Sequence, residues 1–195
     1  MHCHNNRATR VLAAAALVWC AAPSLRAQGQ SGYRVLSTAR TSTMQKEVQE
    51  AAEAGFRFAD VIGGETAIGG SEVIVVMARG SDPALYEYRL LATSKTSTMQ
   101  KELQEAGDAG FDYRGQTQFK SAFGGKEVVA ILERPKDPAA RLRFEYRVLA
   151  TSKTSTMQKE LTEAAERGFE FAGLTVGKTL MGGDEVVSIL RRQAR

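Results

Sequence analysis

The feature that most constrains this chain is a heptad, TSTMQKE, that occurs three times in its 195 residues. Its copies span 41–47, 96–102 and 154–160, and similar segments flank each copy in the same order. Residues 87–105 match residues 145–163 at 17 of 19 positions. A repeat of this length predicts tandem copies of one structural unit.

The repeat boundaries predict three units, at 31–80, 86–134 and 144–192. The connectors Gly80-Ser81-Asp82-Pro83 and Pro135-Lys136-Asp137-Pro138 have the residues of polar turns. Counted with its connector, each unit has about 55 to 60 residues, a size at which the buried core is marginal by itself. We therefore expect the three units to share surfaces.

Each unit has the pattern of β-α-β-β. A short run rich in β-forming residues opens it, and the heptad then begins a helix whose apolar residues recur at helical spacing. A glycine (Gly55, Gly110 or Gly168) ends the helix, with a phenylalanine after it to fold back on the last turn. The last run is continuously apolar, as in a central strand covered on both faces. The predicted fold is α+β, three tandem units each with a three-stranded antiparallel sheet in the order 1-3-2 packed by one helix.

The start of each helix has the pattern of a capping box. Ser42, Ser97 and Ser155 each precede a glutamine by three residues, at Gln45, Gln100 and Gln158. In a capping box the two side chains satisfy free amide groups at the helix start. The sequence thus predicts these serines as helix caps.

The first 27 residues are typical of a secretory signal peptide. Two arginines and no acidic residue precede the apolar run 11–22, and a short polar segment follows it. A run of 12 residues is short for a membrane span, which needs about 20. We expect cleavage after Ala27, export to the periplasm or the outside of the cell, and no membrane span in the mature chain.

Composition excludes several classes of chemistry from the expected mature chain. Both His, both Cys and the single Trp lie within residues 1–20. Without them there is no Ser-His-Asp or Cys-His catalysis, no Cys/His zinc site and no disulfide. Past Ala27 there are 23 basic and 22 acidic residues, so a nucleic-acid partner is not indicated. We expect no cofactor and no enzymatic activity.

The units resemble a family of small bacterial β-α-β-β domains of unknown function. The residues that carry the resemblance are Glu145-Tyr146-Arg147-Val148-Leu149, the helix end Gly168-Phe169-Glu170 and the apolar strand that ends in Arg191. The family has Gly-Trp-Glu at the helix end, whereas this chain has Gly-Phe in every unit. The resemblance implies a fold and supplies no catalytic residues.

The loops at the helix starts are the candidate ligand site. They combine hydroxyl groups with a basic residue near the positive end of a helix dipole, an arrangement that can hold a phosphate, sulfate or carboxylate. The candidate residues are Arg40, Ser42, Lys95, Ser97, Lys153 and Ser155. The alternative is that the serines serve only as helix caps.

Two further patterns have simpler interpretations. Met44, Met99 and Met157 could bind Cu(I) through their thioethers, but each lies one turn before an apolar residue and fits core packing. The Gly-Gly pairs at 69–70, 124–125 and 182–183 fit hairpin turns. Neither pattern predicts a ligand.

These observations favour an exported, non-enzymatic repeat protein that acts as an interaction or scaffold module. Its partner would be a protein or a component of the cell envelope. The alternative is a binder of small anionic ligands that uses the three helix-start loops.

Overall fold

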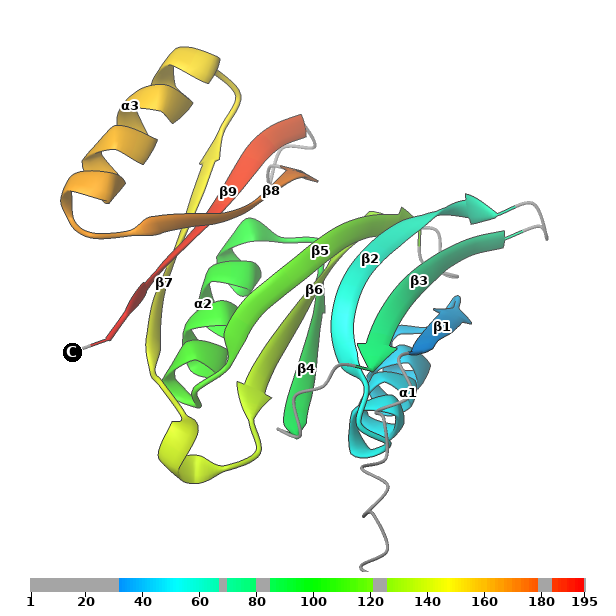
Figure 1. Ribbon diagram of the computed structural model, residues 1–195. Helices are drawn as coiled ribbons and strands as arrows, with labels where there is room; N and C mark the ends of the chain where they lie inside the picture. The colour runs from blue at the N-terminus through cyan, green and yellow to red at the C-terminus, as the bar shows by residue number, and fades with distance from the viewer. Residues whose placement is uncertain (1–31, 67–69, 80–84, 121–125, 179–183, 195) are drawn as a thin grey trace, which may run out of the picture.

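The computed structural model describes residues 32–66, 70–79, 85–120, 126–178 and 184–194, and it confirms the predicted fold class (Figure 1). Three antiparallel sheets of three strands each carry one helix. The expected signal segment lies outside the described residues, as do the predicted Gly-Gly turns apart from Gly70.

The elements follow the β-α-β-β order in every unit. Unit 1 consists of β1 (Gly32–Thr38), α1 (Thr41–Glu53), β2 (Arg57–Thr66) and β3 (Gly70–Arg79). Unit 2 consists of β4 (Tyr86–Thr93), α2 (Thr96–Asp108), β5 (Asp112–Lys120) and β6 (Lys126–Pro135). A short 3-10 helix, η1 (Pro138–Ala140), leads to unit 3, which consists of β7 (Phe144–Thr151), α3 (Thr154–Glu166), β8 (Glu170–Lys178) and β9 (Asp184–Gln193).

The last strand of each unit is the central one, as predicted. The strand orders are β1-β3-β2, β4-β6-β5 and β7-β9-β8, and all pairs are antiparallel. Strands β2, β5 and β8 each contain a bulge shortly after their start. The bulge bends the edge strand, as an extra residue in one strand of a pair does.

The predicted helix ends are also confirmed. Gly55, Gly110 and Gly168 have φ of 84°, 86° and 79°, the left-handed conformation that glycine adopts without strain. The amide of the following phenylalanine donates back to the helix, Phe56 to the Ala51 carbonyl oxygen at 3.0 Å and Phe111 to that of Ala106 at 2.9 Å. This pattern closes the helix and returns the chain to the sheet.

The predicted serine caps are wrong. The residues at the N-cap positions are Arg40, Lys95 and Lys153, and none makes a side-chain capping bond. Each serine lies one residue inside the helix. Thr38, Thr93 and Thr151 shape the turn instead, because each hydroxyl accepts the amide of the N-cap residue at 3.2 Å. The turn is set from the preceding strand, so the serine side chains are not needed there.

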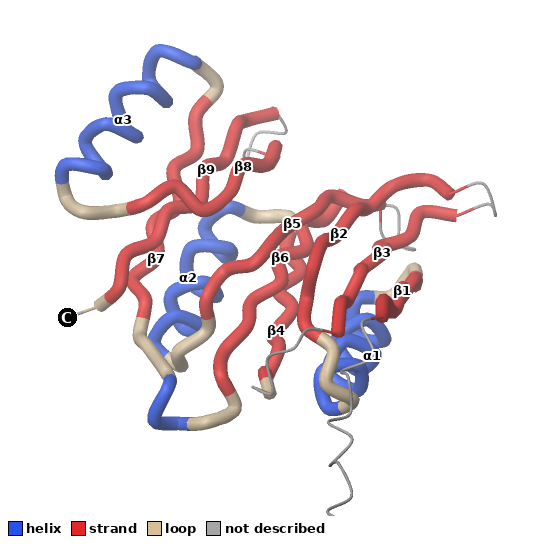
Figure 2. Tube along the Cα trace, in the orientation of Figure 1, coloured by secondary structure: helices blue, strands red, loops and turns tan. Residues whose placement is uncertain are grey.

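The units stack so that a helix of one unit lies against the sheet of the next (Figure 2). Helix α1 packs on β1 and β3 of its own unit and on β4 of unit 2. Helix α2 packs in the same way on β4 and β7. Helix α3 contacts β7 and β8 of its own unit and lies at the opposite end of the molecule from β1 (Figure 1).

This stacking explains the apolar central strands. In β6, Val128, Ala130 and Leu132 face the cluster around α2, while Val129 and Ile131 join the cluster around α1. In β9, Val187 and Ile189 face α2, whereas Leu190 packs in the cluster of α3. Both faces of β6 and β9 are thus covered, as predicted. For β3 the prediction is wrong: only Val73, Val75 and Met77 are buried, on the side of α1, because no helix covers the other face among the described residues.

The methionines of the heptad were predicted to lie in the core, and this is confirmed in two of the three units. Met44 and Met99 are buried in clusters that combine residues of their own unit with residues of the next unit. Met157, on the last helix, is half-buried.

None of the helices in the described ranges is long and apolar enough to cross a membrane.

Candidate functional site

The contact between a helix and the next sheet, here called a junction, depends on glutamine side chains. Gln45 donates from Nε2 to the Tyr88 carbonyl oxygen at 2.9 Å and accepts the Leu90 amide on Oε1 at 2.7 Å. Gln49 accepts the Tyr88 amide at 3.2 Å. The two side chains therefore satisfy the outer edge of β4, which would otherwise have unpaired backbone groups.

The second junction repeats these bonds. Gln100 donates to the Tyr146 carbonyl oxygen at 3.0 Å and accepts the Val148 amide at 2.7 Å. Gln104 accepts the Tyr146 amide at 3.0 Å. The same contact thus forms twice. The helix of unit 1 packs on the sheet of unit 2, and the helix of unit 2 packs on the sheet of unit 3.

A tyrosine from the next unit anchors each junction. Tyr88 is 4% exposed, and its hydroxyl accepts the Phe58 amide at 2.8 Å and donates to Glu133 at 2.5 Å. Tyr146 is also 4% exposed, and its hydroxyl accepts the Tyr113 amide at 2.7 Å and donates to the Phe111 carbonyl oxygen at 3.0 Å. Burial raises the pKa of both hydroxyls. Both tyrosines are thus neutral hydrogen-bonding anchors at the helix end of the preceding unit.

Each junction also contains an ion pair. In the first, Arg57 of unit 1 donates to Glu133 of unit 2 at 2.7 Å, and Arg114 of unit 2 donates to the same carboxylate at 2.7 Å. In the second, Asp112 of unit 2 pairs with Arg191 of unit 3. These are equivalent positions in the repeat with the charges exchanged.

The carboxylate of Glu133 is buried yet stays ionised. Burial by itself raises the pKa of this group. The hydrogen bonds from Arg57 and Tyr88, with the charge of Arg114, outweigh that effect and hold the pKa of Glu133 below its ordinary value. Opposite charges and hydrogen bonds to the charged form lower a carboxyl pKa in this way.

Glycines let the units approach closely at four positions. A Cβ at Gly63 of β2 would lie 2.4 Å from the Gln118 carbonyl oxygen of unit 2. A Cβ at Gly107 of α2 would lie 2.2 Å from the Phe144 carbonyl oxygen. One at Gly115 would lie 2.9 Å from the Phe58 ring, and one at Gly173 would lie 2.3 Å from the Tyr113 hydroxyl. At these positions a side chain would push neighbouring units apart.

At the unit 1 end of the stack, the sheet face that is covered in units 2 and 3 has no helix over it among the described residues. We call this the open head face. It consists of the apolar residues Tyr33, Val35, Ile62, Ile74 and Val76, together with the exposed Asp60, which lies opposite Val76. Tyr33, Val35 and Ile62 are 78%, 64% and 65% exposed. The equivalents of Ile74 and Val76 in units 2 and 3 (Val129, Ile131, Val187 and Ile189) are fully buried. Unit 1 thus presents to solvent a sheet face that is mostly apolar and carries one charged residue, Asp60.

At the other end, the outer side of α3 has no sheet against it in the described part of the chain. We call this the open tail face. It consists of Met157, Gln158, Thr162 and Ala165, with Leu161 at its border, where that side chain also packs on the core of unit 3. Ala165 is exposed, whereas the equivalent Ala52 and Gly107 are buried under the next sheet. Gln158 bonds only within its own helix, to Thr162 at 3.3 Å, among the described residues. The open head face therefore corresponds to the sheet side of a junction, and the open tail face corresponds to the helix side.

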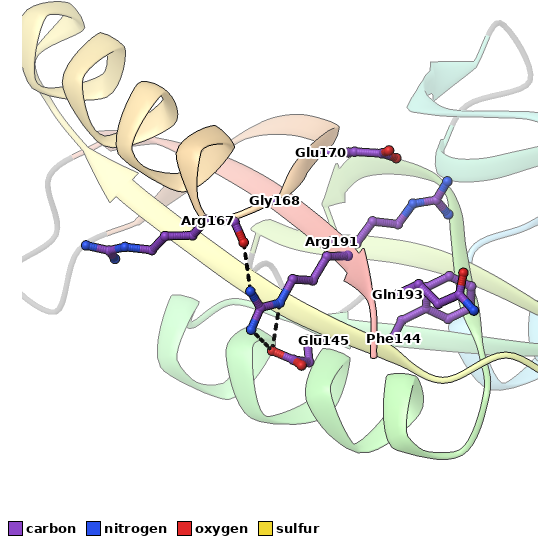
Figure 3. A pocket seen from close by; sticks show the side chains of 8 residues that line it. Phe144, Glu145, Arg167, Gly168, Glu170, Arg191 and Gln193 are labelled. Carbon is purple, nitrogen blue, oxygen red and sulfur yellow. Dashed lines mark hydrogen bonds and ion pairs between the residues drawn. The ribbon is translucent and has the colours of Figure 1, made fainter. Parts of the chain in front are cut away.

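A polar pocket lies at the end of unit 3 (Figure 3). Its lining comprises Phe144, Glu145, Arg167, Gly168, Glu170, Arg191, Arg192 and Gln193. Arg192 donates to Glu145 at 2.6 Å and to the Arg167 carbonyl oxygen at 2.7 Å, and it stacks on the Phe169 ring. Figure 3 shows the Arg167 side chain directed away from this ion pair. Arg192 therefore already has protein partners.

The pocket marks a region that is covered in unit 2. There, a Cβ at Gly110 would meet the Leu142 carbonyl oxygen of the connector at 3.2 Å, whereas one at Gly168 would meet nothing within 4 Å. Arg134 in unit 2 repeats the contacts of Arg192, to Glu87 and to the Ala109 carbonyl oxygen. The pocket is thus an uncovered position of the repeat, and its ion pair is structural.

The structure places the six candidate anion-binding residues at the starts of three separate helices. Arg40, Lys95 and Lys153 are the N-cap residues, and Ser42, Ser97 and Ser155 lie in the first turns. At α2 a carboxylate of the protein is already present, because the Thr96 hydroxyl donates to Glu185 of unit 3 at 2.7 Å. A small-anion site at these residues stays a prediction. The described residues contain no cluster of acidic, His and Cys side chains that suits a metal ion.

The expectation that the units share surfaces is confirmed, because α1 packs on β4 and α2 on β7. The sequence did not identify the residues that form the junctions, although signals for them were present. A helix whose apolar residues are accompanied by two polar but uncharged glutamines is one signal, and the exchanged charges at equivalent repeat positions are another. A scan of protein-family models and searches of the curated proteins and the solved structures found no match to the chain. The resemblance to the small bacterial domain family therefore stays a prediction.

Proposed function

We propose that the chain is an exported, non-catalytic module that binds another protein through the open ends of its stack. The observation that carries this proposal is the open head face, where Tyr33, Val35 and Ile62 are mostly exposed. Contiguous apolar patches on soluble proteins mark interaction sites more often than isolated apolar residues do. Such a patch is what a protein partner covers.

The composition of this face supports the proposal. Unit 1 has Ile62 at the position where units 2 and 3 have Thr117 and Thr175. The uncovered sheet is thus more apolar at this position than the two sheets that a helix covers. Isoleucine in place of threonine gives no benefit on a surface that stays in contact with water. On a binding surface it adds apolar area that is buried when the partner binds, which stabilises the complex.

The remaining parts of the proposal come from the sequence. Export is supported by the arginine-flanked apolar run at the N-terminus. A non-catalytic role is supported by the positions of both His and both Cys, which all precede the expected cleavage after Ala27. The polar groups of the junctions are engaged in holding units together, which is a structural task.

Photochemical cross-linking in cells that make the chain tests the proposal. Benzoylphenylalanine replaces Val35 on the open head face, Ala165 on the open tail face, or, as a control, the exposed Ala140 of η1. The proposal predicts discrete adducts from Val35 and Ala165 that the control lacks, with the partner identified by mass spectrometry. Identical adduct patterns at all three positions, or none, would contradict it.

A further inference from the structure

The open faces are complementary to each other, and we infer that the partner is a second copy of this chain. In this assembly α3 of one copy covers the open head face of the next. The inference rests on the proposed function and adds the identity of the partner. It follows from the two internal junctions, which already join a helix face of this type to a sheet face of this type.

The open head face keeps the groups that an internal junction uses. Tyr33 is equivalent to Tyr88 and Tyr146, the anchors whose hydroxyls reach the helix end of the preceding unit. The amides of Tyr33 and Val35 are equivalent to those of Tyr88 and Leu90, which donate to glutamines of α1. A helix with glutamines in that position would satisfy this edge of β1.

The open tail face supplies such a helix. Gln158 is equivalent to Gln45 and Gln100, which bond to the backbone of the next first strand. Met157, Leu161 and Ala165 are equivalent to Met99, Leu103 and Gly107, which are buried in the second junction. The helix keeps the apolar stripe and the first glutamine of the junction although no sheet covers them.

The contact between copies is weaker than the internal junctions, for three reasons visible in the repeat. Asp60 stands where units 2 and 3 have Gly115 and Gly173, so its side chain meets the ring of Phe171 from the other copy. Thr162 replaces the second glutamine, and Glu170 would face Ala78, which has no charge. These differences make the assembly reversible and dependent on concentration.

The symmetry of the contact gives a distinctive test. Two different surfaces meet, so each copy keeps a free head and a free tail, and the assembly grows as a ring or a filament instead of stopping at a dimer. A copy with a blocked head can still use its tail, and a copy with a blocked tail can still use its head. Mixing the two must therefore give one junction and no more.

The test uses sedimentation velocity on the full chain and two blocking variants, Val35→Glu and Ala165→Glu. Both positions are exposed, so neither change disturbs the fold of a single copy. The matched control is Ala140→Glu, which adds the same charge away from both faces. Thermal unfolding of each variant, followed by circular dichroism, confirms that it is folded.

We expect the unmodified chain and the control to form species larger than a dimer as concentration rises toward about 1 mM. Each blocking variant alone should be monomeric, with association weakened at least about tenfold. An equal mixture of the two should form a 1:1 dimer. An unmodified chain that stays monomeric, or a blocking variant that associates like the control, would overturn the inference.

A gain of association provides a second test. Asp60→Gly restores the glycine of the internal junctions and should strengthen self-association about tenfold, whereas no change would count against the proposed geometry.

The cross-linking experiment separates the proposal of self-association from the proposed interaction function. An adduct from Val35 with a different protein would refute self-association and leave the interaction function standing, and no adduct would refute both.

Discussion

Arg57 and Glu133 form an ion pair between units 1 and 2, and the equivalent positions in the next junction, Asp112 and Arg191, have the opposite charges. With the charges exchanged, unit 3 docked on unit 1 would place Arg191 beside Arg57. Repulsion between like charges in a partly buried site disfavours that arrangement. The exchange therefore fixes the order of three otherwise similar units.

Replacing Glu133 with glutamine should destabilise the fold by about 1.5–3 kcal/mol, the range for hydrogen bonds to charged groups. The Arg57 and Arg114 side chains are 40% and 35% exposed, so water limits the loss to less than that for a fully buried pair. Urea unfolding measures the change. The control Glu105→Gln removes an exposed pair with Lys101 and should shift the stability by less than about 0.5 kcal/mol.

The same carboxylate predicts a dependence of stability on pH. The pKa of Glu133 in the folded state lies below its ordinary value of 4.5, so its contribution is fully present above pH 4.5. That contribution is lost as the pH falls through the folded-state pKa, because the unfolded chain binds the proton more readily. Urea midpoints measured between pH 7 and about 3 should fall less steeply in Glu133→Gln than in the unmodified chain. Equal slopes would refute this role.

Tyr146→Phe should destabilise the fold by about 1–3 kcal/mol, because it leaves the buried Tyr113 amide and Phe111 carbonyl groups without their hydroxyl partner. The equivalent change at Tyr33 should be neutral in dilute solution, because that side chain is 78% exposed. Chemical unfolding of both variants checks the difference. Equal effects would mean that the anchor does not depend on the junction.

Gln100→Ala should cost about 1–2 kcal/mol, since two bonds to the backbone of β7 are lost. Gln158→Ala is the matched control and should change stability by less than about 0.5 kcal/mol at low concentration. If the two variants unfold at the same urea concentration, the glutamines do not hold the units together.

Gly107→Ala tests close packing against helix propensity. Alanine in the interior of a helix is favoured over glycine by about 1 kcal/mol, so an isolated α2 would be stabilised. In the folded chain the new Cβ would lie 2.2 Å from the Phe144 carbonyl oxygen. We expect a net loss of about 1–3 kcal/mol, as for overpacked cores. A rise in thermal stability would show that the second junction tolerates a wider spacing.

The fold of a single unit was predictable because its signals are local. The glycine at each helix end needs positive φ, and the apolar last strand is favoured at the centre of its sheet, so the helix boundary and the 1-3-2 order follow from sequence. The arrangement of units was not predictable, because it depends on contacts between residues far apart. Gln45 illustrates this: its spacing from Ser42 suggested a cap, yet its side chain reaches Tyr88.

At the candidate site, too, the local structure could be predicted from the sequence, but the contacts between units could not. Sequence comparison of the three units assigns the apolar residues of α3 to the core, but Ala165 is exposed because no sheet follows it in the described residues. Near-identical sequences thus have different environments according to their place in the stack. Val35 is exposed to water, whereas the equivalent Leu90 packs against the cluster around α1, because unit 2, unlike unit 1, has the helix of a preceding unit beside it in the described residues.

Hydrogen exchange at the amide of Val35 tests the central claim most directly, because the equivalent Leu90 amide donates to Gln45 of α1 and α3 keeps the equivalent glutamine, Gln158. If the open head face is completed by α3 of another copy, exchange at this amide should slow as the protein concentration rises. The Ala165→Glu variant should show no such change. Exchange that is independent of concentration in both proteins would contradict the account.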